Sequence, residues 1–550
     1  MIGMAFRDMH IHQLLYSIVL IGIFAVVAKT APRHWHDLWQ RFLGALSALA
    51  RHKTLCCIGL GALVLILRAA LLPIWPMPRP IIYDEFSYLL QADTFAHGRL
   101  TSPTHPLWQF FESTYILQQP TYASRFPPAQ ALALAAGQLL FGHPWFGVWL
   151  SVGLLAAALC WALQGWLPPG WALLGAFIGL DLCLFSYWMN SYWGGAVAAI
   201  GGALLIGAWP RITWAKRWRY AWLFGIGAVI VILARPFEGS LLVVPALVAL
   251  GIANRTARVW LPIIITGVLG ASWLAYDNYR VTGHPLRLPY REYYEQYEIV
   301  PPFSIVPIST TSRTLRHFDL ESRNRKTYER ARSWHLFIDR PLDWLALLRY
   351  YFGNLIWLLP VVIFIPALWR SNRTRFALIL TAIVGAVSLV EVWWYPHYGA
   401  PFLTALLILA AQSMRYASQW NYRGHCVGRF LMIAIPVAVF VVTITSQAEA
   451  IAAHQTTDQV QAKNAQIAQK KSIEQALRKK KPGQHVIFVS YTGLPSPHEE
   501  WIYNPANIDA APVIWTLDLG QTENEKLRRY YAGRSFWRFK PAESMSLSPY

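Results

Sequence analysis

The feature that most constrains the fold of this chain is a series of long apolar windows. A helix needs about 20 mostly apolar residues to cross the roughly 30 Å hydrocarbon core of a bilayer, and tilt widens that range. Of the 550 residues, 55% are hydrophobic and only 14% are charged. We therefore predict an all-α polytopic membrane protein with about twelve transmembrane helices, further helices at the outer interface and a small C-terminal α/β domain. The windows lie near residues 12–28, 55–74, 145–164, 171–189, 192–209, 219–234, 236–253, 259–276, 349–368, 376–394, 398–414 and 430–447.

The positions of Lys and Arg orient these windows. If the short apolar stretch 128–142 does not cross, six loops share one side and carry 17 Lys and Arg, whereas the short loops opposite carry only Arg235. Basic loops stay in the cytoplasm, so we expect residues 128–142 to lie at the outer interface. The same distribution explains the net charge of +20 without nucleic acid. Cleavage of a signal peptide would leave the basic loop 29–53 outside, so a retained first span is preferred.

This topology divides the chain into three parts. Residues 1–54 form a first span and a basic cytoplasmic loop, and residues 55–447 form the transmembrane domain with outer loops at 75–144 and 277–348. From residue 448 the composition becomes polar, and we expect a helix over 448–481. Strand-like runs at 485–491, 511–517 and 535–539, with a helix at 523–531, predict a small α/β domain on the outer face. Such a domain suits a structural or docking role.

Two adjacent carboxylates, Asp84 and Glu85, open an amphipathic segment directly after the second span. One interpretation is that they cap this helix and favour its N-terminal dipole. The functional interpretation is that a carboxylate takes a proton from an acceptor hydroxyl or binds a divalent cation. Consecutive helical residues diverge by about 100°, so the two acids need not share a role.

The other candidate residues lie in outer turns between spans. Asn190 and Tyr192 belong either to an aromatic belt or to a cleft wall that stacks on sugar rings. Arg235 either pairs with Glu238 across a hairpin or binds a lipid phosphate. The remaining candidates for substrate or lipid-phosphate binding are Arg125, His397 and Tyr398, with Glu391 near the same turn and Asp181 inside a span.

The most specific motifs of the chain are YDEFSYLLQADTFAHGRLTSP and RFPPAQALALAAGQLLFG. With the order of spans over residues 55–415, they resemble the GT-C membrane glycosyltransferases, above all the family-39 group of protein O-mannosyltransferases and aminoarabinose transferases. The resemblance implies transfer of a sugar from a polyprenyl-phosphate donor to a glycan, lipid or protein acceptor at the outer face, usually with inversion. It also implies that Asp84 is the base or the carboxylate that orients the acceptor.

One position departs from the family pattern. Many relatives carry a second acid where this chain has Asn190, so the ligands of a divalent cation stay unassigned, with Glu238 as one substitute. A compact chain with short loops further suggests the bacterial inner membrane, with the site on the periplasmic side. Two other functions stay open. A transporter or flippase would explain Asp181 inside a span, and a non-catalytic scaffold would use the C-terminal domain to bind a partner.

Overall fold

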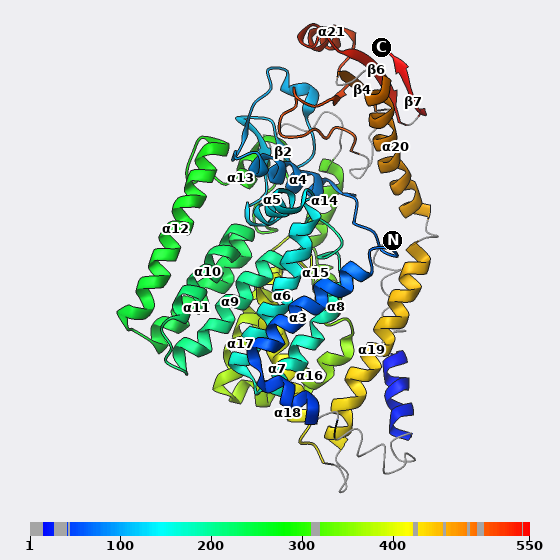
Figure 1. Cartoon of the computed structure of the whole chain (residues 1–550). Helices are drawn as coiled ribbons and strands as arrows, with labels where there is room; N and C mark the ends of the chain where they lie inside the picture. The colour runs from blue at the N-terminus through cyan, green and yellow to red at the C-terminus, as the bar shows by residue number, and fades with distance from the viewer. Residues whose placement is uncertain are drawn as a thin grey trace.

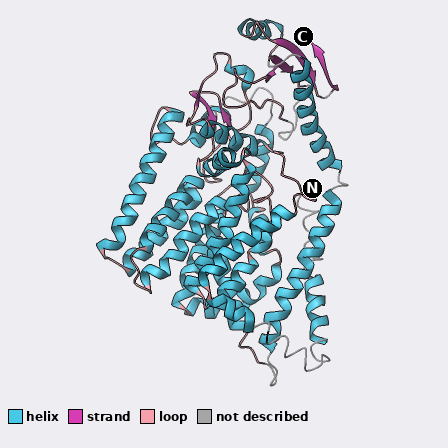
Figure 2. Cartoon of the chain, in the orientation of Figure 1, coloured by secondary structure: helices cyan, strands magenta, loops and turns pink. Residues whose placement is uncertain are grey.

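The computed structural model describes residues 15–26, 41, 44–309, 320–421, 427–454, 458–480, 484–491, 500–541 and 543–550. Helices form a long bundle, and the few strands lie beyond one of its ends (Figures 1 and 2). Most of the predicted basic loop 29–53 lies outside the described residues. The mostly helical architecture with a small C-terminal α/β domain is confirmed.

Within the described residues, six helices are long and apolar enough to cross a membrane, so the chain is an integral membrane protein. A further pair, α15 (Leu336–Phe352) with η2 and α16 (Leu355–Arg370), passes the same test together but bends by 98°. Four shorter apolar helices, 10–17 residues long, include Leu15–Val26 and α5 (Ala129–Phe141). The six long helices are α3 (Lys53–Ala70), α6 (Trp145–Trp166), α9 (Ala196–Thr213), α11 (Pro236–Ala253), α12 (Ala257–Thr282) and the Phe430–Glu449 part of α19 (Val427–His454).

The other helices are shorter because polar residues or turns interrupt the apolar windows. The number of spans, predicted as about twelve, therefore stays a prediction. These helices are α7 (Pro169–Ile178), α8 (Leu180–Phe185), α10 (Tyr220–Ala234), η2 (Leu355–Trp357), α16 (Leu358–Arg370), α17 (Asn372–Ser388), η3 (Ala400–Phe402) and α18 (Leu403–Ala417).

Small residues let the helices approach closely, as is common in membrane bundles. A Cβ on Gly137 of α5 would lie 2.0 Å from the backbone nitrogen of Gly147 in α6. A Cβ on Gly202 of α9 would lie 2.1 Å from the carbonyl oxygen of Pro401 in η3. The first contact joins α5, near the end of the first outer loop, to α6, and the second joins α9 to η3.

The first outer loop and α13 form a cap over one end of the bundle (Figure 1). Helix α5 has only 13 residues and packs between α4 and α6, in keeping with the interfacial helix predicted for residues 128–142. The strands of the cap form an antiparallel sheet in the order β1-β3-β2, which the sequence analysis did not predict. The elements of the cap are α4 (Tyr83–Ala96), β1 (Ser102–Pro103), η1 (Trp108–Phe111), β2 (Ile116–Leu117), β3 (Thr121–Ser124), α13 (Pro289–Tyr297) and α14 (Leu320–Ala331).

The C-terminal domain has a four-stranded sheet in the order β5-β4-β6-β7. The three predicted strands are parallel, and β7 adds an antiparallel edge that was not predicted. The domain packs on the cap, where Phe110 and Phe111 share an apolar cluster with Val486 and Phe488. Its elements are α20 (Asp458–Lys480), β4 (His485–Val489), β5 (Val513–Leu517), α21 (Gln521–Tyr530), β6 (Ser535–Lys540) and β7 (Ser544–Pro549).

Candidate active site

The two carboxylates at the start of α4 have different surroundings. Glu85 is buried, and its two oxygens accept backbone N–H groups of Ile81 (2.6 Å), Ile82 (3.1 Å) and Tyr192 (3.0 Å). As the third residue of the helix, Glu85 reaches back to the N-cap residue Ile82, as in half of a capping box. Burial raises the pKa of Glu85 to about 7, while the three N–H groups act in the opposite direction. Glu85 therefore ties α4 to the turn that contains Tyr192.

Asn190 and Tyr192 belong to the turn that Glu85 connects to α4, and we call this connection the α4 joint. Asn190 accepts a hydrogen bond from Arg68 Nε at 3.1 Å, and the hydroxyl of Tyr192 donates to the carbonyl of Pro78 at 2.9 Å. Arg68 is fully buried and also donates to the carbonyl of Trp75. The structure thus places these two predicted residues beside Glu85. Their side chains form hydrogen bonds with other parts of the protein.

Asp84 instead lies among the charges of the cap and of the bundle end. Its carboxylate is half-buried. Burial raises the pKa of Asp84 to about 6, against the opposing charges of Arg125 and Arg235, while Glu298 raises it further. A carboxyl group with this pKa is mostly ionised at neutral pH and still basic enough to accept a proton.

Arg125, which follows β3, is enclosed and neutralised. Its Nη1 lies 2.7 Å from Glu298 Oε1, and the two side chains are only 5% and 7% exposed. Tyr115 and Tyr290 flank the guanidinium, with ring centroids 3.2 and 4.6 Å from its Cζ. Burial lowers the pKa of Arg125, but Glu298 more than compensates, so that the group stays charged. The Arg125–Glu298 ion pair thus forms one wall of the site.

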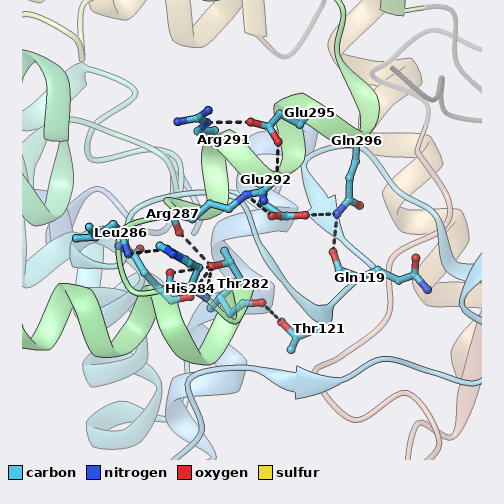
Figure 3. A network of polar contacts seen from close by, with 12 residues as sticks. Gln119, Thr121, Thr282, His284, Leu286, Arg287, Arg291, Glu292, Glu295 and Gln296 are labelled. Atoms are coloured by element: carbon cyan, nitrogen blue, oxygen red, sulfur yellow. Dashed lines mark hydrogen bonds and ion pairs between the residues drawn. The ribbon is translucent and has the colours of Figure 1, made fainter. Parts of the chain in front are cut away.

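Helix α13 brings Glu298 and Tyr290 to Arg125, and a polar network holds this helix against the first outer loop (Figure 3). Gln296 Nε2 donates to the carbonyl of Gln119 at 3.0 Å and to Glu292 Oε1 at 2.6 Å. Glu292 also pairs with Arg287 at 2.6 Å. The outer loop 277–348 therefore contributes to the site through α13.

Arg235 lies in the turn between α10 and α11, with its Cζ 4.8 Å from the ring centroid of Tyr398. Burial lowers its pKa, but Tyr88 and Glu238 raise it more, so Arg235 stays charged. Within the described part of the chain, its guanidinium has no ion pair or hydrogen bond. The alternative of a mutual Arg235–Glu238 ion pair is wrong for the described residues, although Glu238 is buried nearby. Of the two predicted arginines, Arg235 is the one with free donors.

His397 lies in the turn before η3 and is 3% exposed. Its Nδ1 is 2.7 Å from the hydroxyl of Tyr187, and Trp193 packs edge-on at 4.7 Å. Burial, and then the charge of Arg235, lower the pKa of His397 well below its usual range. The imidazole is therefore neutral at physiological pH, and it supports Tyr187 rather than supplying a second cation.

The structure brings together Asp84, Arg125, Arg235, Glu238 and Tyr398, and it places Glu85, Asn190 and Tyr192 in the adjoining joint. Glu298 and Tyr290 were missed as site residues. Both lie in or next to the segment HPLRLPYREYYEQY, whose density of Tyr and charge was the available signal.

Two remaining predictions concern acids and metals. Asp181, in a different part of the bundle, faces the charge of Arg349 from α15. Among the residues that the structure describes, no three His, Cys, Asp or Glu side chains gather closely enough to hold a metal ion. The divalent cation stays a prediction.

Neither a protein-family model nor a curated protein sequence matches this chain. In fold, it is similar to the crystal structure of ArnT from Cupriavidus metallidurans in the apo state, with a TM-score of 0.51 and 14% identity over 88% of this chain and 93% of that chain. ArnT is an aminoarabinose transferase with a GT-C fold. The predicted GT-C fold of this chain is therefore confirmed.

Two further solved structures match less well. ArnT from Cupriavidus metallidurans bound to undecaprenyl phosphate has a TM-score of 0.49 and 14% identity over 87% of this chain and 88% of that chain. The apo oligosaccharyltransferase of Archaeoglobus fulgidus has a TM-score of 0.46 and 11% identity over 84% of this chain and 64% of that chain.

Proposed function

We propose that this protein is a glycosyltransferase that passes a sugar from a polyprenyl-phosphate donor to an acceptor hydroxyl, with Asp84 as the base. The observation that carries the proposal is the position of Asp84 near the charges of the buried Arg125 and the half-buried Arg235 at one end of a GT-C bundle. ArnT, which has the same fold, has been crystallised with undecaprenyl phosphate. The site would face the periplasm of a bacterial inner membrane, because the positions of Lys and Arg in the sequence assign the basic loops to the opposite side of the membrane.

The chemistry is a displacement at the anomeric carbon. The acceptor oxygen attacks this carbon, the bond from the carbon to the phosphate oxygen breaks, and the hydroxyl proton passes to Asp84. The electron pair of the broken bond leaves with the polyprenyl phosphate, which gains one negative charge. A single displacement inverts the anomeric configuration. A base whose pKa is about 6 contributes roughly 10²–10⁴ in rate to such a step.

Arg235 is the cation for the leaving phosphate. Arg125 already pairs with Glu298 at 2.7 Å, whereas Arg235 has free donors within the described residues. A preorganised guanidinium opposite a developing phosphate charge stabilises the transition state without reorganisation. Tyr290 and Tyr398, beside the two arginines, offer ring faces and hydroxyls to the sugar. Glu85 acts as a positioning residue, since its oxygens are used by three backbone N–H groups.

Asp84→Asn tests the proposal in the purified full-length protein. We expect release of polyprenyl phosphate from a polyprenyl-phosphate sugar, with a membrane extract as the acceptor source, to fall by about 10²–10⁴. The variant should be no less stable at pH 7.5, because the rise in the pKa of Asp84 from 3.8 to about 6 means that burial of this charge costs up to about 3 kcal/mol. Glu295→Gln, on the exposed side of α13, is the control and should keep full activity.

The same assay separates the alternatives. Full transfer by Asp84→Asn would remove the catalytic claim. Movement of the lipid-linked sugar across proteoliposomes without an acceptor, unaffected by Asp84→Asn, would favour a transporter. Arg235→Gln should lower turnover at least about tenfold, since a hydrogen bond to a charged group contributes about 1.5–3 kcal/mol.

A further inference from the structure

A cavity lies at the opposite end of the bundle from Asp84. Its volume is about 250 Å³, and its lining includes Trp166, Ser371, Arg373, Gln412 and Arg415. These residues come from the end of α6, the start of α17 and the last turns of α18. Figure 1 shows α7, α17 and α18 at the end of the bundle away from α4, α5 and α13. None of these residues takes part in the proposed reaction.

The cavity contains polar groups that the described residues leave unpaired. Gln412 is 93% buried, yet its side-chain amide lines the cavity without a hydrogen-bond partner in the described part of the chain. Arg373 and Arg415 likewise make no ion pair among the described residues, and Arg373 only stacks over Trp214 at 5.3 Å. A buried amide without a partner is costly unless a ligand satisfies it, and the exposed Arg373 and half-buried Arg415 leave their guanidinium donors available to the same ligand.

The surroundings favour an anion. Helix α17 has 17 residues and begins at this cavity, and the side chain of its N-cap residue Ser371 makes no capping hydrogen bond. Its first N–H groups and dipole therefore add positive potential. The loops 165–170, 210–219, 254–258, 369–375 and 415–429, which the sequence analysis assigns to one side of the membrane, contain twelve Lys and Arg and no Asp or Glu. No acid in these loops can neutralise the cavity.

Trp166, in the lining of the cavity, belongs to an aromatic cluster. Trp166 stacks on Trp209 at 5.7 Å, Trp209 stacks on Phe376 at 5.0 Å, and Trp214 meets Trp166 edge-on at 5.0 Å. Trp side chains prefer the membrane interface, where one edge is apolar and the other is wet. A ligand in this cavity meets guanidinium donors and an apolar surface that includes Trp166, Leu167 and Ile408.

We propose that this cavity binds the phosphate of an anionic phospholipid headgroup at the membrane face opposite Asp84. The two guanidinium forks, the amide of Gln412 and the hydroxyl of Ser371 supply donors for the tetrahedral phosphate. Basic pockets between transmembrane helices are known to accept such headgroups. The inference is independent of the proposed reaction, because it rests on residues at the other end of the bundle.

Native mass spectrometry of the full-length protein in detergent, titrated with phosphatidylglycerol, tests the proposal. The variant Arg373→Gln/Arg415→Gln should lose one tightly bound lipid, with affinity lowered about tenfold or more. The matched control is Arg255→Gln/Arg258→Gln, which removes the same charge from the same face, outside the cavity lining. It should bind as the wild type does. Equal losses in the two variants would show general charge attraction and overturn the proposal.

Two further arms separate the remaining outcomes. Gln412→Leu keeps a similar volume and leaves every charge in place, so weaker lipid binding by this variant supports a specific headgroup contact. Binding unchanged in both Gln412→Leu and the double arginine variant would overturn it. Inorganic phosphate at millimolar concentration should displace little phosphatidylglycerol. Full displacement by phosphate, lost in the arginine variant, would assign the cavity to a soluble phosphate instead of a lipid.

Discussion

The buried ion pair of Arg125 and Glu298 offers a direct test of how the cap is held together. We consider Glu298→Gln, which keeps the size of the side chain and removes its charge. The pair is 2.7 Å long, and both side chains are at least 93% buried, so solvent cannot replace the lost carboxylate. Removing one partner of such a pair leaves an uncompensated buried charge and costs about 3–5 kcal/mol. The rings of Tyr115 and Tyr290 return part of this energy through cation–π contact, so we expect about 3 kcal/mol.

The free energy of unfolding can be measured by titrating the protein in mixed micelles with dodecyl sulfate and following Trp fluorescence. Glu295→Gln on the same helix is the matched control. Glu295 pairs with Arg291 at 2.8 Å and also with Arg287, but its side chain is 40% exposed, and each exposed pair contributes at most about 1 kcal/mol. If Glu298→Gln costs no more than Glu295→Gln, the reasoning about burial is refuted.

A double-mutant cycle then isolates the pair. Arg125→Gln/Glu298→Gln leaves no unpaired buried charge, so the double variant should be less destabilised than the sum of the two single variants. Additive effects would mean that the guanidinium is stabilised mainly by its aromatic neighbours. The cycle also bears on function, because a neutralised Arg125 leaves Arg235 as the free cation for a phosphate.

Three further predictions concern pH, the α4 joint and helix packing. Turnover should fall about tenfold per pH unit below about pH 6, because Asp84 must be ionised to accept a proton; a flat profile between pH 5 and 7 would contradict this. Glu85→Gln should lower the free energy of unfolding by about 1–3 kcal/mol in the same dodecyl sulfate titration. The reason is that the amide NH₂ of the glutamine would face a backbone N–H such as that of Tyr192. Unchanged stability would refute the capping role. Gly137→Ala should destabilise the bundle in thermal unfolding, because its Cβ would overlap α6 at 2.0 Å, whereas Gly59→Ala meets open space and should not; similar melting temperatures would contradict the close approach.

The burial that raises the pKa of Asp84 also makes the stability of the fold depend on pH. The folded protein holds the Asp84 proton more tightly than the unfolded chain does, so this group favours folding most below pH 3.8. That contribution is lost as the pH rises through about 6. A group that destabilises the fold at neutral pH is typical of an active site.

Much of the architecture could be predicted from short stretches of the chain. The apolar windows, the position of α4 and the three parallel strands of the C-terminal domain follow from local hydrophobicity and periodicity. Strand β7 was missed because the segment SMSLSP contains no β-branched or aromatic residue, although its apolar residues alternate with serine, and because it pairs only once β6 is in place. The short strands β1–β3 were missed because they have two to four residues each.

The roles of the two adjacent acids could not be separated by their position in the sequence. Glu85 accepts a hydrogen bond from the backbone N–H of Tyr192, 107 residues later in the chain. Arg125 pairs with the carboxylate of Glu298, 173 residues later. Such approaches depend on how the outer loops fold over the bundle, and local patterns carry no information about them.

Hydropathy and charge were thus sufficient to identify a membrane bundle with acids at one end and basic loops at the other, because both properties act through the bilayer on each segment separately. Which arginine is free and which is neutralised depends instead on the burial of specific partners. Only the packing of α13 and the cap against the bundle leaves Arg235 with free donors among the described residues and pairs Arg125 with Glu298. The electrostatic character of Asp84 follows from that packing, since its pKa reflects desolvation and distant charges rather than its neighbours in the chain.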